Sequence, residues 1–327
     1  MQKLNVAVIG AGGHAQGHFA MIKNEPEMRL VAVAEINPER LFRAKEQHQP
    51  EFTFTDYREM LDKCDLDIVY VETMPGHLLP IVLDCLARNI HTSIEKSPGM
   101  NSAETEQLLS AAKKCQGKAM VSFDRRYKPE VLAVRKLVFE RGGAVHCSAT
   151  YNKPLSRLML PEWEKIAPTP IICDAIHHVD LLRWLAGSAE EKSADVVEVY
   201  AEAWSGDRLG TPRYNAVIKF ENGCCGVMMS HYGVGFRIQR AEVHAEDFSA
   251  YLDLTGAPKC ELYDKEKAYA KSLDLDAVGG PGFNETRHFI ECIKEDKTPW
   301  SNLEDALKTM KLCEAIERGH KGKLIDG

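Results

Sequence analysis

The first third of the chain alternates short apolar segments with longer amphipathic ones. The apolar segments have the length and the continuous hydrophobic character of strands that are buried on both faces of a parallel sheet. They comprise residues 4–9, 30–34, 66–71, 90–94 and 119–123. Residues 78–88 and 102–114, which lie between them, show helical spacing. Strands that alternate with helices predict right-handed crossovers, and hence a doubly wound α/β sheet over residues 1–123.

The pattern changes after residue 123. One amphipathic helix is predicted at residues 130–140, and the segments that follow alternate with period two between turn signals such as Glu221-Asn222-Gly223. These predicted strands are residues 196–204, 214–220, 224–231, 240–246 and 249–254. The mixed-charge run 264–267 is expected to be a solvated turn, and residues 284–319 return to helical spacing. We therefore predict a second, α+β domain over residues 124–327, with an open-faced, mainly antiparallel sheet and a helical tail.

A glycine cluster follows the first predicted strand directly. Gly10-Ala11-Gly12-Gly13-His14-Ala15 fits the pattern G-x-G-x-x-G/A. The first glycine permits a tight turn, the second lets the backbone approach a pyrophosphate, and the small third position lets helix and strand pack closely. The helix that begins here directs its positive end toward the phosphates. This predicts a Rossmann dinucleotide site with Gly10, Gly12, Gly13 and His14. For the side chains of His14 and His18 we favour the alternative of a helix-surface or interface position.

Glu35 ends the second predicted strand, at the spacing expected of the acid that binds the ribose hydroxyls. Its carboxylate would repel a 2′-phosphate, and Ile36-Asn37-Pro38 after it supplies no cation. NAD is therefore the predicted cofactor. Arg40 and Arg43 follow closely in the sequence, so NADP stays open as an alternative.

Composition restricts the other classes of function. The 327 residues exceed what one hydrophobic core usually organises, and the formal charge of −7 lacks the basic footprint of a nucleic-acid-binding protein. No apolar run has the length of a membrane span, the N-terminus lacks the apolar stretch of a cleavable leader, and the ten cysteines are scattered. We expect a cytoplasmic protein that binds neither nucleic acid nor membrane. The zinc-site spacings C-x-x-C and H-E-x-x-H and a G-x-S-x-G elbow are missing, so neither a metal site nor a serine hydrolase is predicted.

Further motifs follow the glycine turn and His18 in a fixed order. They are Thr73-Met74-Pro75, Ile94-Glu95-Lys96, Phe123-Asp124-Arg125-Arg126-Tyr127-x-Pro129 and His177-x-x-Asp180-Leu-Leu-Arg-Trp-Leu-x-Gly187. Together they resemble the Gfo/Idh/MocA family of glucose-fructose oxidoreductases and inositol dehydrogenases over nearly the whole chain. The resemblance implies a Rossmann domain followed by an open-faced sheet, and activity on a hydroxyl or carbonyl of sugars, inositols or related polyols. It also implies a homodimer or homotetramer built on the open sheet face.

The resemblance assigns roles to particular residues. Lys96 matches the family's catalytic lysine, Glu95 matches the acid before it, and His177 matches the active-site histidine. The loop that contains Thr73, Pro75 and His77 corresponds to a cofactor-binding loop, so these residues and Glu95 join the cofactor site.

Three places depart from the family's pattern. Ser97 stands where a proline is usual after the lysine. Cys173 occupies the position of the family's catalytic aspartate, with Asp174 one residue later. Pro75 and His77 are each displaced by one residue.

Oxidation of a secondary alcohol needs a base within hydrogen-bond reach of the hydroxyl. Lys96 is the first candidate, because a lysine beside an oxidised nicotinamide releases its proton more readily. A surface lysine at the end of a strand is the alternative. His177 is the candidate partner in a proton relay. Asp174 either orients the imidazole of His177 or caps the helix that begins near it.

The remaining candidates surround these residues in the sequence. Tyr127 and Asp180 join Lys96 and His177 as candidate substrate ligands, although we slightly favour a structural role for Asp180. Arg125 and Arg126 reach cofactor or substrate, or form salt bridges at the domain junction. His178 projects about a hundred degrees away from His177 on a helix and is assigned to packing or a sheet interface.

Three functions stay open. The first is an NAD(P)-dependent dehydrogenase or reductase that acts on CH–OH groups of a sugar, inositol or related polyol. The second is an NAD-dependent glycosidase-type enzyme, in which the cofactor is oxidised or reduced transiently and regenerated within one turnover. The third is a non-catalytic NAD(H)-binding sensor. The substrate itself does not follow from the sequence, since the loop 151–170, expected to line the pocket, cannot be placed.

Overall fold

The computed structural model describes residues 3–154, 163–187, 189, 191–204, 211–265, 267–269 and 273–324, so residues 155–162 of the predicted pocket loop lie outside it. The chain forms two compact units. The first comprises Met1–Ser122 and Glu285–Ala306, and the second comprises Phe123–Asn284 and Leu307–Gly327. The sequence prediction kept residues 124–327 together. The structure instead returns Glu285–Ala306 to the first unit, where Phe289 and Ile290 are fully buried.

A six-stranded parallel sheet forms the centre of the first unit, in the order β3-β2-β1-β4-β5-β6. Its strands are β1 (Leu4–Ile9), β2 (Met28–Ala34), β3 (Phe52–Phe54), β4 (Ile68–Val71), β5 (His91–Ile94) and β6 (Ala119–Val121). The predicted doubly wound sheet is confirmed. The sequence reading missed β3, because its three residues are exposed or half-buried and form no apolar run.

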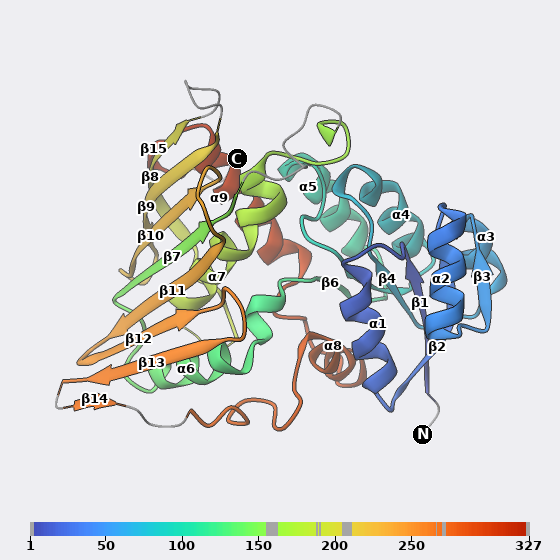
Figure 1. The fold of residues 1–327 in the computed structure, drawn as a ribbon, viewed down its shortest axis with the longest axis horizontal. Coiled ribbons are helices and arrows are strands. Elements are labelled where there is room, and N and C mark those ends of the chain that lie inside the picture. The colour runs from blue at the N-terminus through green and yellow to red at the C-terminus, as the bar shows by residue number, and fades with distance from the viewer. Residues whose placement is uncertain are drawn as a thin grey trace. The chain divides into compact units, whose positions relative to one another are not determined.

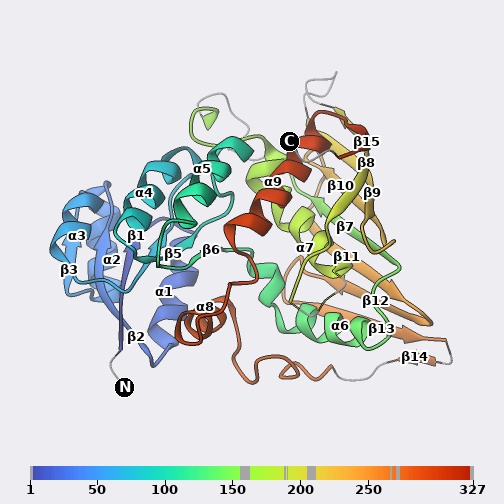
Figure 2. The same ribbon diagram turned by 180° about the vertical axis from the view of Figure 1, so that it is seen from behind.

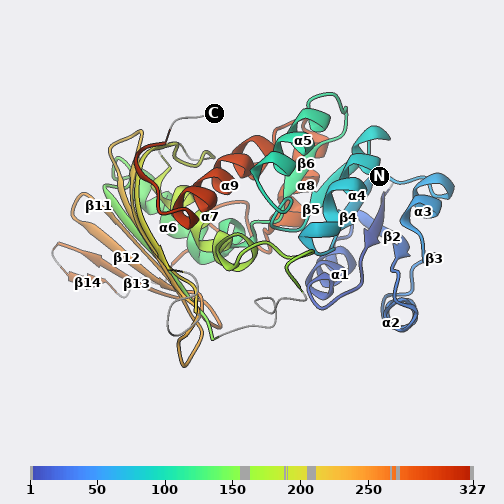
Figure 3. The ribbon, with the colours of Figure 1, turned by 90° about the horizontal axis from the view of Figure 1, so that it is seen from above.

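Helices cover both faces of this sheet. They are α1 (Ala15–Asn24), α2 (Pro38–His48), α3 (Tyr57–Lys63), α4 (Pro75–Ala87), α5 (Ser102–Ala112) and α8 (Glu285–Lys294). In Figure 3, α4 and α5 lie on one face and α1 lies on the other. The returning helix α8 lies beside α1, since the Arg287 guanidinium is 3.2 Å from the Glu25 carboxylate, just after α1. Two helix starts show how the sequence sets these boundaries: Asn37 and Asn101 accept backbone hydrogen bonds as N-caps of α2 and α5.

The second unit contains a nine-stranded sheet in the order β14-β13-β12-β11-β7-β10-β9-β8-β15. Its strands are β7 (His146–Asn152), β8 (Val196–Trp204), β9 (Arg213–Phe220), β10 (Cys225–His231), β11 (Ile238–Ala245), β12 (Phe248–Asp253), β13 (Lys259–Asp264), β14 (Lys267–Tyr269) and β15 (Lys321–Lys323). Only β7 and β10 pair in parallel, so the predicted mainly antiparallel sheet is confirmed. The predicted turn at 264–267 connects β13 to β14; residue 266 lies outside the described residues.

Helices gather on one face of this sheet, as Figures 1 and 2 show for α6 (Pro129–Phe139) and α7 (Ile176–Ala186). The 3₁₀ turn η1 (Asp124–Tyr127) precedes α6, a π-helical turn η4 (Ile171–Ala175) precedes α7, and α9 (Leu303–Glu317) follows later in the chain. The other face carries large, partly exposed side chains, one from each of five strands: Tyr200, Val217, Met229, Tyr251 and Tyr263. Within the described residues, no helix has the length and apolarity to cross a membrane.

Candidate active site

The glycine turn joins β1 to α1 in the first unit. Gly10 has a φ of 94°, and a Cβ at this position would lie 2.3 Å from the carbonyl oxygen of Glu72, so only glycine fits. A Cβ on Gly12 or Gly13 would meet nothing within 4 Å. Open space therefore adjoins the backbone of the turn, as a bound pyrophosphate requires.

The start of α1 suits an anion. His14 is the N-cap residue, its side chain is exposed, and it makes no capping hydrogen bond. The first turn of α1 contains no acidic residue. The helix therefore presents its positive end without a competing carboxylate.

Glu35 is buried directly after β2 and is fixed beside the glycine turn. Its Oε2 accepts a hydrogen bond from the backbone N–H of Ala11 at 2.7 Å, and its Oε1 accepts one from Asn37 at 2.9 Å. A carboxylate held in this way retains acceptor capacity for the hydroxyls of a ribose. The open turn, the uncapped helix start and Glu35 together fit an NAD molecule.

The loop before α4 adjoins the same turn. Thr73 Cγ2 would lie 3.2 Å from a Cβ on Gly10, so Thr73 and the glycine turn are neighbours. Thr73 Oγ1 is buried and has no hydrogen-bond partner among the described residues. Pro75 is the first residue of α4, and His77 lies exposed in its first turn. The first turn of α4 also lacks acidic residues.

Lys96 follows β5 and is 8% exposed, so it is not the surface lysine of the alternative interpretation. Its Nζ lies 3.8 Å from Glu95 Oε1, and the Glu95 backbone N–H donates to Val71 at the end of β4. The sheet therefore places this lysine at the carboxyl edge of the strands, where open α/β sheets bind their ligands.

A buried cluster lies near Lys96 in the first unit. His18 Nε2 is 3.4 Å from Glu72 Oε2, and His18 Nδ1 is 3.8 Å from Glu285 Oε1. Burial, followed by the charges of Glu95 and Glu285, raises the pKa of the Glu72 carboxyl well above its usual value. The predicted surface or interface position is wrong for His18, which the fold encloses among these carboxyls.

Ligand atoms of His18, Glu72 and Glu95 all lie within 4.8 Å of one another, which is compact enough for a metal ion. His18 lies in α1, and Glu72 and Glu95 directly follow β4 and β5, so no local spacing could have revealed the group. The sequence prediction of no metal site rested on local spacings alone.

In the second unit, His177 is buried in the first turn of α7. Its Nδ1 lies 3.4 Å from Asp124 Oδ1, and its Nε2 lies 3.5 Å from Arg125 Nη1. Arg125 Nη1 also donates to Asp124 Oδ1 at 2.5 Å. The imidazole is thus held between a carboxylate and a guanidinium that bind each other.

Asp174 lies in the π-helical turn before α7. Its Oδ2 accepts a hydrogen bond from Lys153 Nζ at 2.7 Å. The N-cap of α7 is Ala175, so the alternative in which Asp174 caps this helix is wrong. The π-helical turn continues directly into α7, which leaves no capping position for Asp174.

Asp180 and Arg126 form a fully buried ion pair. Arg126 Nε donates to Asp180 Oδ2 at 2.7 Å and Nη2 donates to Oδ1 at 2.5 Å, while Thr309 Oγ1 donates to the same Oδ1. Neither charged side chain is exposed, so the structure supports the structural role for Asp180. Tyr127 is also buried, at 3% exposure.

His178 is fully buried and meets the ring of Tyr151 edge-on, with centroids 5.1 Å apart. Burial, followed by the charges of Arg125 and Arg237, holds its pKa well below the usual value. His178 is therefore a neutral packing residue.

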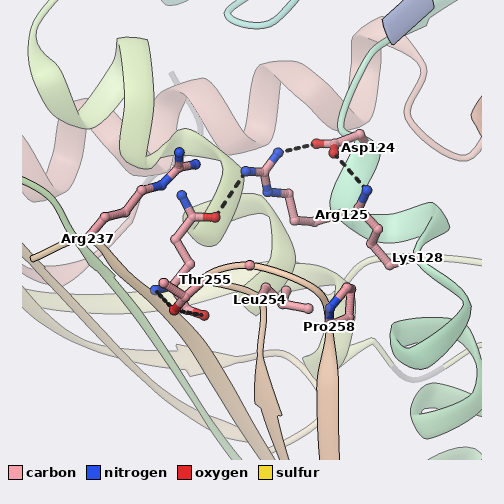
Figure 4. A pocket seen from close by; sticks show the side chains of 9 residues that line it. Asp124, Arg125, Lys128, Arg237, Leu254, Thr255 and Pro258 are labelled. Atoms are coloured by element: carbon pink, nitrogen blue, oxygen red, sulfur yellow. Dashed lines mark hydrogen bonds and ion pairs between the residues drawn. The ribbon is translucent and has the colours of Figure 1, made fainter. Parts of the chain in front are cut away.

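A cavity of about 220 Å³ lies close to His177 within the second unit. It is lined by Asp124, Arg125, Lys128, Arg237, Gln239, Leu254, Thr255, Gly256 and Pro258. Figure 4 shows Arg125 and Lys128 directed at Asp124, with Arg237 extending from the segment before β11 and Thr255 and Pro258 below. Sequence reasoning missed Arg237 and Gln239. One signal for Gln239 was available: it is a polar residue at a position of β11 where the alternating pattern expects a buried side chain.

Comparison with known proteins identifies the first unit. Residues 4–123 match a family model described as the oxidoreductase family with an NAD-binding Rossmann fold, the model of the Gfo/Idh/MocA group. Residues 4–123 belong to the NAD-binding domain of the Gfo/Idh/MocA family. The protein is an enzyme of the NAD(P)-dependent dehydrogenase and reductase class, and NAD is its cofactor. The resemblance seen in the motifs is confirmed.

Individual Gfo/Idh/MocA relatives extend over most of the chain. An uncharacterized oxidoreductase, YrbE of Bacillus subtilis, is 27% identical over 264 residues, which cover 77% of this chain and 74% of the relative. Inositol 2-dehydrogenase of Paracoccus denitrificans is 29% identical over 189 residues, 56% and 54% of the two chains. The structure of levoglucosan dehydrogenase in complex with NADH superposes with a TM-score of 0.84 at 19% identity and covers 100% of both chains. The last comparison shows a shared fold.

Proposed function

We propose that the enzyme transfers a hydride between NAD and a hydroxyl or carbonyl carbon of a sugar, an inositol or a related polyol. The observation that carries this proposal is Lys96, buried beside Glu95 at the carboxyl edge of the NAD-binding sheet. Relatives named inositol 2-dehydrogenase and levoglucosan dehydrogenase support a CH–OH substrate of this class.

Bound NAD supplies the hydride acceptor for oxidation. Lys96 Nζ takes the hydroxyl proton as the hydride leaves the carbon, so the alcohol becomes a carbonyl without passing through a free alkoxide. In the reduction direction the Lys96 ammonium returns the proton to the oxygen. Burial of Lys96 excludes water that would otherwise compete for this proton.

On the second unit, we propose that His177 hydrogen-bonds a hydroxyl of the substrate. Asp124 and Arg125 hold the ring at 3.4 Å and 3.5 Å, which restricts its orientation before substrate binds. Asp174, bound to Lys153, supplies a fixed carboxylate in the turn that precedes α7. Tyr127 adds a buried ring to the same η1 segment as Arg125.

We also propose that the enzyme is a homodimer or homotetramer built on the open sheet face. The face carries Tyr200, Val217 and Met229, with exposures of 46%, 43% and 42%, on three consecutive strands. An apolar patch of this kind on a soluble protein is typical of a protein–protein interface. Val217→Lys combined with Met229→Lys is expected to give monomers, which light scattering after size-exclusion chromatography measures directly.

The first experiment is NADH formation at 340 nm with NAD and a panel of inositols, hexoses, sugar acids and glycosides, repeated with NADP. Net NADH with one class supports the dehydrogenase. Product release without net NADH would instead favour the transient-oxidation enzyme, and NAD binding without turnover on any substrate would favour the sensor.

Lys96→Met tests the mechanism. Loss of the base is expected to lower kcat by about 100- to 10,000-fold. NAD affinity, measured by calorimetry, should stay within a few-fold of the parent, because the predicted contacts with NAD come from other residues. Lys63→Met, which removes an exposed lysine of α3, is the matched control. Unchanged turnover in the Lys96 variant contradicts the proposed role.

A further inference from the structure

We propose that the cavity beside His177 binds an anionic oxygen group of the substrate, a carboxylate or a phosphate, so that the enzyme acts on acidic sugars or polyols. This inference rests on the proposed function, because it names the substrate class of the same site. Three observations support it: the charges of the residues that line the cavity, the hydrogen-bond donors among them, and the position of the cavity close to His177. All of these residues belong to the second unit.

Positive charge predominates in the lining of the cavity. Arg125, Lys128 and Arg237 supply three cations, and Asp124 is the single acid among the described residues that line it. Asp124 is already engaged, since Arg125 Nη1 lies 2.5 Å and Lys128 Nζ 3.6 Å from its oxygens. Asp124 therefore neutralises one of the three cations, and the cavity retains a positive charge that an anion would balance.

Gln239 adds a directed donor. It is 1% exposed, and its Oε1 accepts a hydrogen bond from Arg125 Nη2 at 3.1 Å. This bond fixes the amide, while its Nε2 is buried with no acceptor among the described residues. An unsatisfied buried donor costs roughly 1–3 kcal/mol, and a ligand oxygen would satisfy it. A hydroxyl could serve here, but an anionic oxygen also balances the surrounding charge.

Arg237 is the most accessible cation of the cavity. Its side chain is exposed. Arg237 lies directly before β11, two residues before Gln239. Figure 4 shows Arg125 and Arg237 on the same side of the Thr255 turn. Both arginines lower the pKa of buried His178, so their positive potential reaches the start of α7. Two guanidinium groups with a neighbouring amide match the acceptor-only character of a carboxylate or phosphate.

The cavity is coupled to the candidate chemistry by direct contacts. Arg125 Nη1 lies 3.5 Å from His177 Nε2, and Asp124 Oδ1 lies 3.4 Å from His177 Nδ1. A substrate whose anionic end occupies the cavity would therefore extend its hydroxyl-bearing carbons toward His177. Aldonates, uronates and sugar phosphates have this arrangement, while neutral sugars lack the anchoring group.

The test compares acidic and neutral ligands of matched skeleton. Binding of D-galacturonate, D-gluconate and D-glucose 6-phosphate to the full chain with NAD is measured by calorimetry, alongside D-galactose and D-glucose, and turnover is measured separately. We expect at least one acidic ligand to bind more tightly than its neutral counterpart. Arg237→Gln and Gln239→Glu should each weaken that ligand about 10-fold or more, and should weaken its neutral counterpart less, because the neutral ligand lacks the anionic group.

Arg240→Gln is the matched control, since Arg240 is an exposed arginine of β11 that pairs with Asp253 and does not line the cavity. Preference for the carboxylates or for the phosphate supports the inference and identifies the group. Equal binding of each acidic ligand and its neutral counterpart, with no effect of Arg237→Gln on the acidic ligand, overturns the inference, while turnover of a neutral sugar keeps the proposed function standing. Arg237-dependent binding of an acid without turnover on any substrate leaves the inference standing and overturns the proposed function.

Discussion

Both units bury a carboxyl group close to a candidate functional histidine or lysine, yet they surround it differently. Asp180 in the second unit receives two hydrogen bonds from Arg126 and one from Thr309. Glu72 in the first unit has His18 at 3.4 Å, and its oxygens accept no hydrogen bond from the described residues. Glu95 and Glu285 add further negative charge near it.

This difference separates a structural charge from a proton-holding group. Arg126 and Thr309 supply matched donors to Asp180, so Asp180 ties η1 to α7 and thereby fixes the two segments that carry Arg125 and His177. Burial beside other carboxyls favours the protonated form of Glu72. A buried carboxyl group therefore stabilises the second unit as the charged partner of Arg126, whereas the buried carboxyl of Glu72 in the first unit favours its uncharged, protonated form.

The largest loss in the free energy of unfolding is expected from Asp180→Asn. The substitution leaves the Arg126 guanidinium buried without a counter-charge, which costs roughly 3–5 kcal/mol. The free energy of unfolding, from urea titration followed by circular dichroism, measures the loss. Asp253→Asn at the exposed pair with Arg240 is the control and should cost less than about 1 kcal/mol. If Asp180→Asn and Asp253→Asn lowered the free energy of unfolding equally, the buried ion pair would contribute no more to stability than the exposed one, which contradicts the prediction.

A smaller loss in the free energy of unfolding is expected when both Arg126 and Asp180 are replaced by apolar residues. Arg126→Met combined with Asp180→Leu removes the pair without leaving an isolated charge. The double variant should regain at least half of the stability lost in Asp180→Asn, in the same urea titration. A double variant as unstable as the single one would show that the cost lies in packing against Trp184, over which the Arg126 guanidinium is stacked at 5.1 Å.

The smallest effect is expected from Glu72→Gln, and it depends on pH. The folded-state pKa of Glu72 is raised above the usual 4.5, so wild-type stability falls as pH rises from about that value through the folded pKa. Glutamine cannot ionise and lacks this loss. The Tm of the variant should match the parent near pH 5 and exceed it at pH 8. A difference that is constant between these two pH values contradicts the assignment.

The residues proposed for the NAD site stand close together in the sequence, so a candidate site could be predicted from local motifs. Gly10, Gly12 and Gly13 stand on one turn, and Glu35 ends the next strand along the chain. The steric reason for Gly10, its approach to the Glu72 carbonyl, required the structure.

The anion-binding cavity was not predictable in the same way. Arg125, Arg237 and Thr255 come from η1, from the segment before β11 and from the turn after β12, and only the tertiary fold, including the pairing of β11 with β12, brings them together. The same reason hid Glu285 and its hydrogen bond from Ser122. Helical periodicity indicates which face of α8 is apolar, but not which sheet that face covers.

The assignment of Glu285–Ala306 to the first unit has a consequence for biosynthesis. Ser122 donates to Glu285, and the Val121 backbone N–H donates to Ser301, so the β6 end of the NAD-binding sheet is completed by residues that are translated after most of the second unit. A nascent chain with residues 1–122 outside the ribosome still lacks these partners. The NAD-binding unit therefore finishes folding only after strands β7 to β14 of the second sheet have been synthesised. A fragment that ends at residue 122 should expose apolar surface that α8 normally covers.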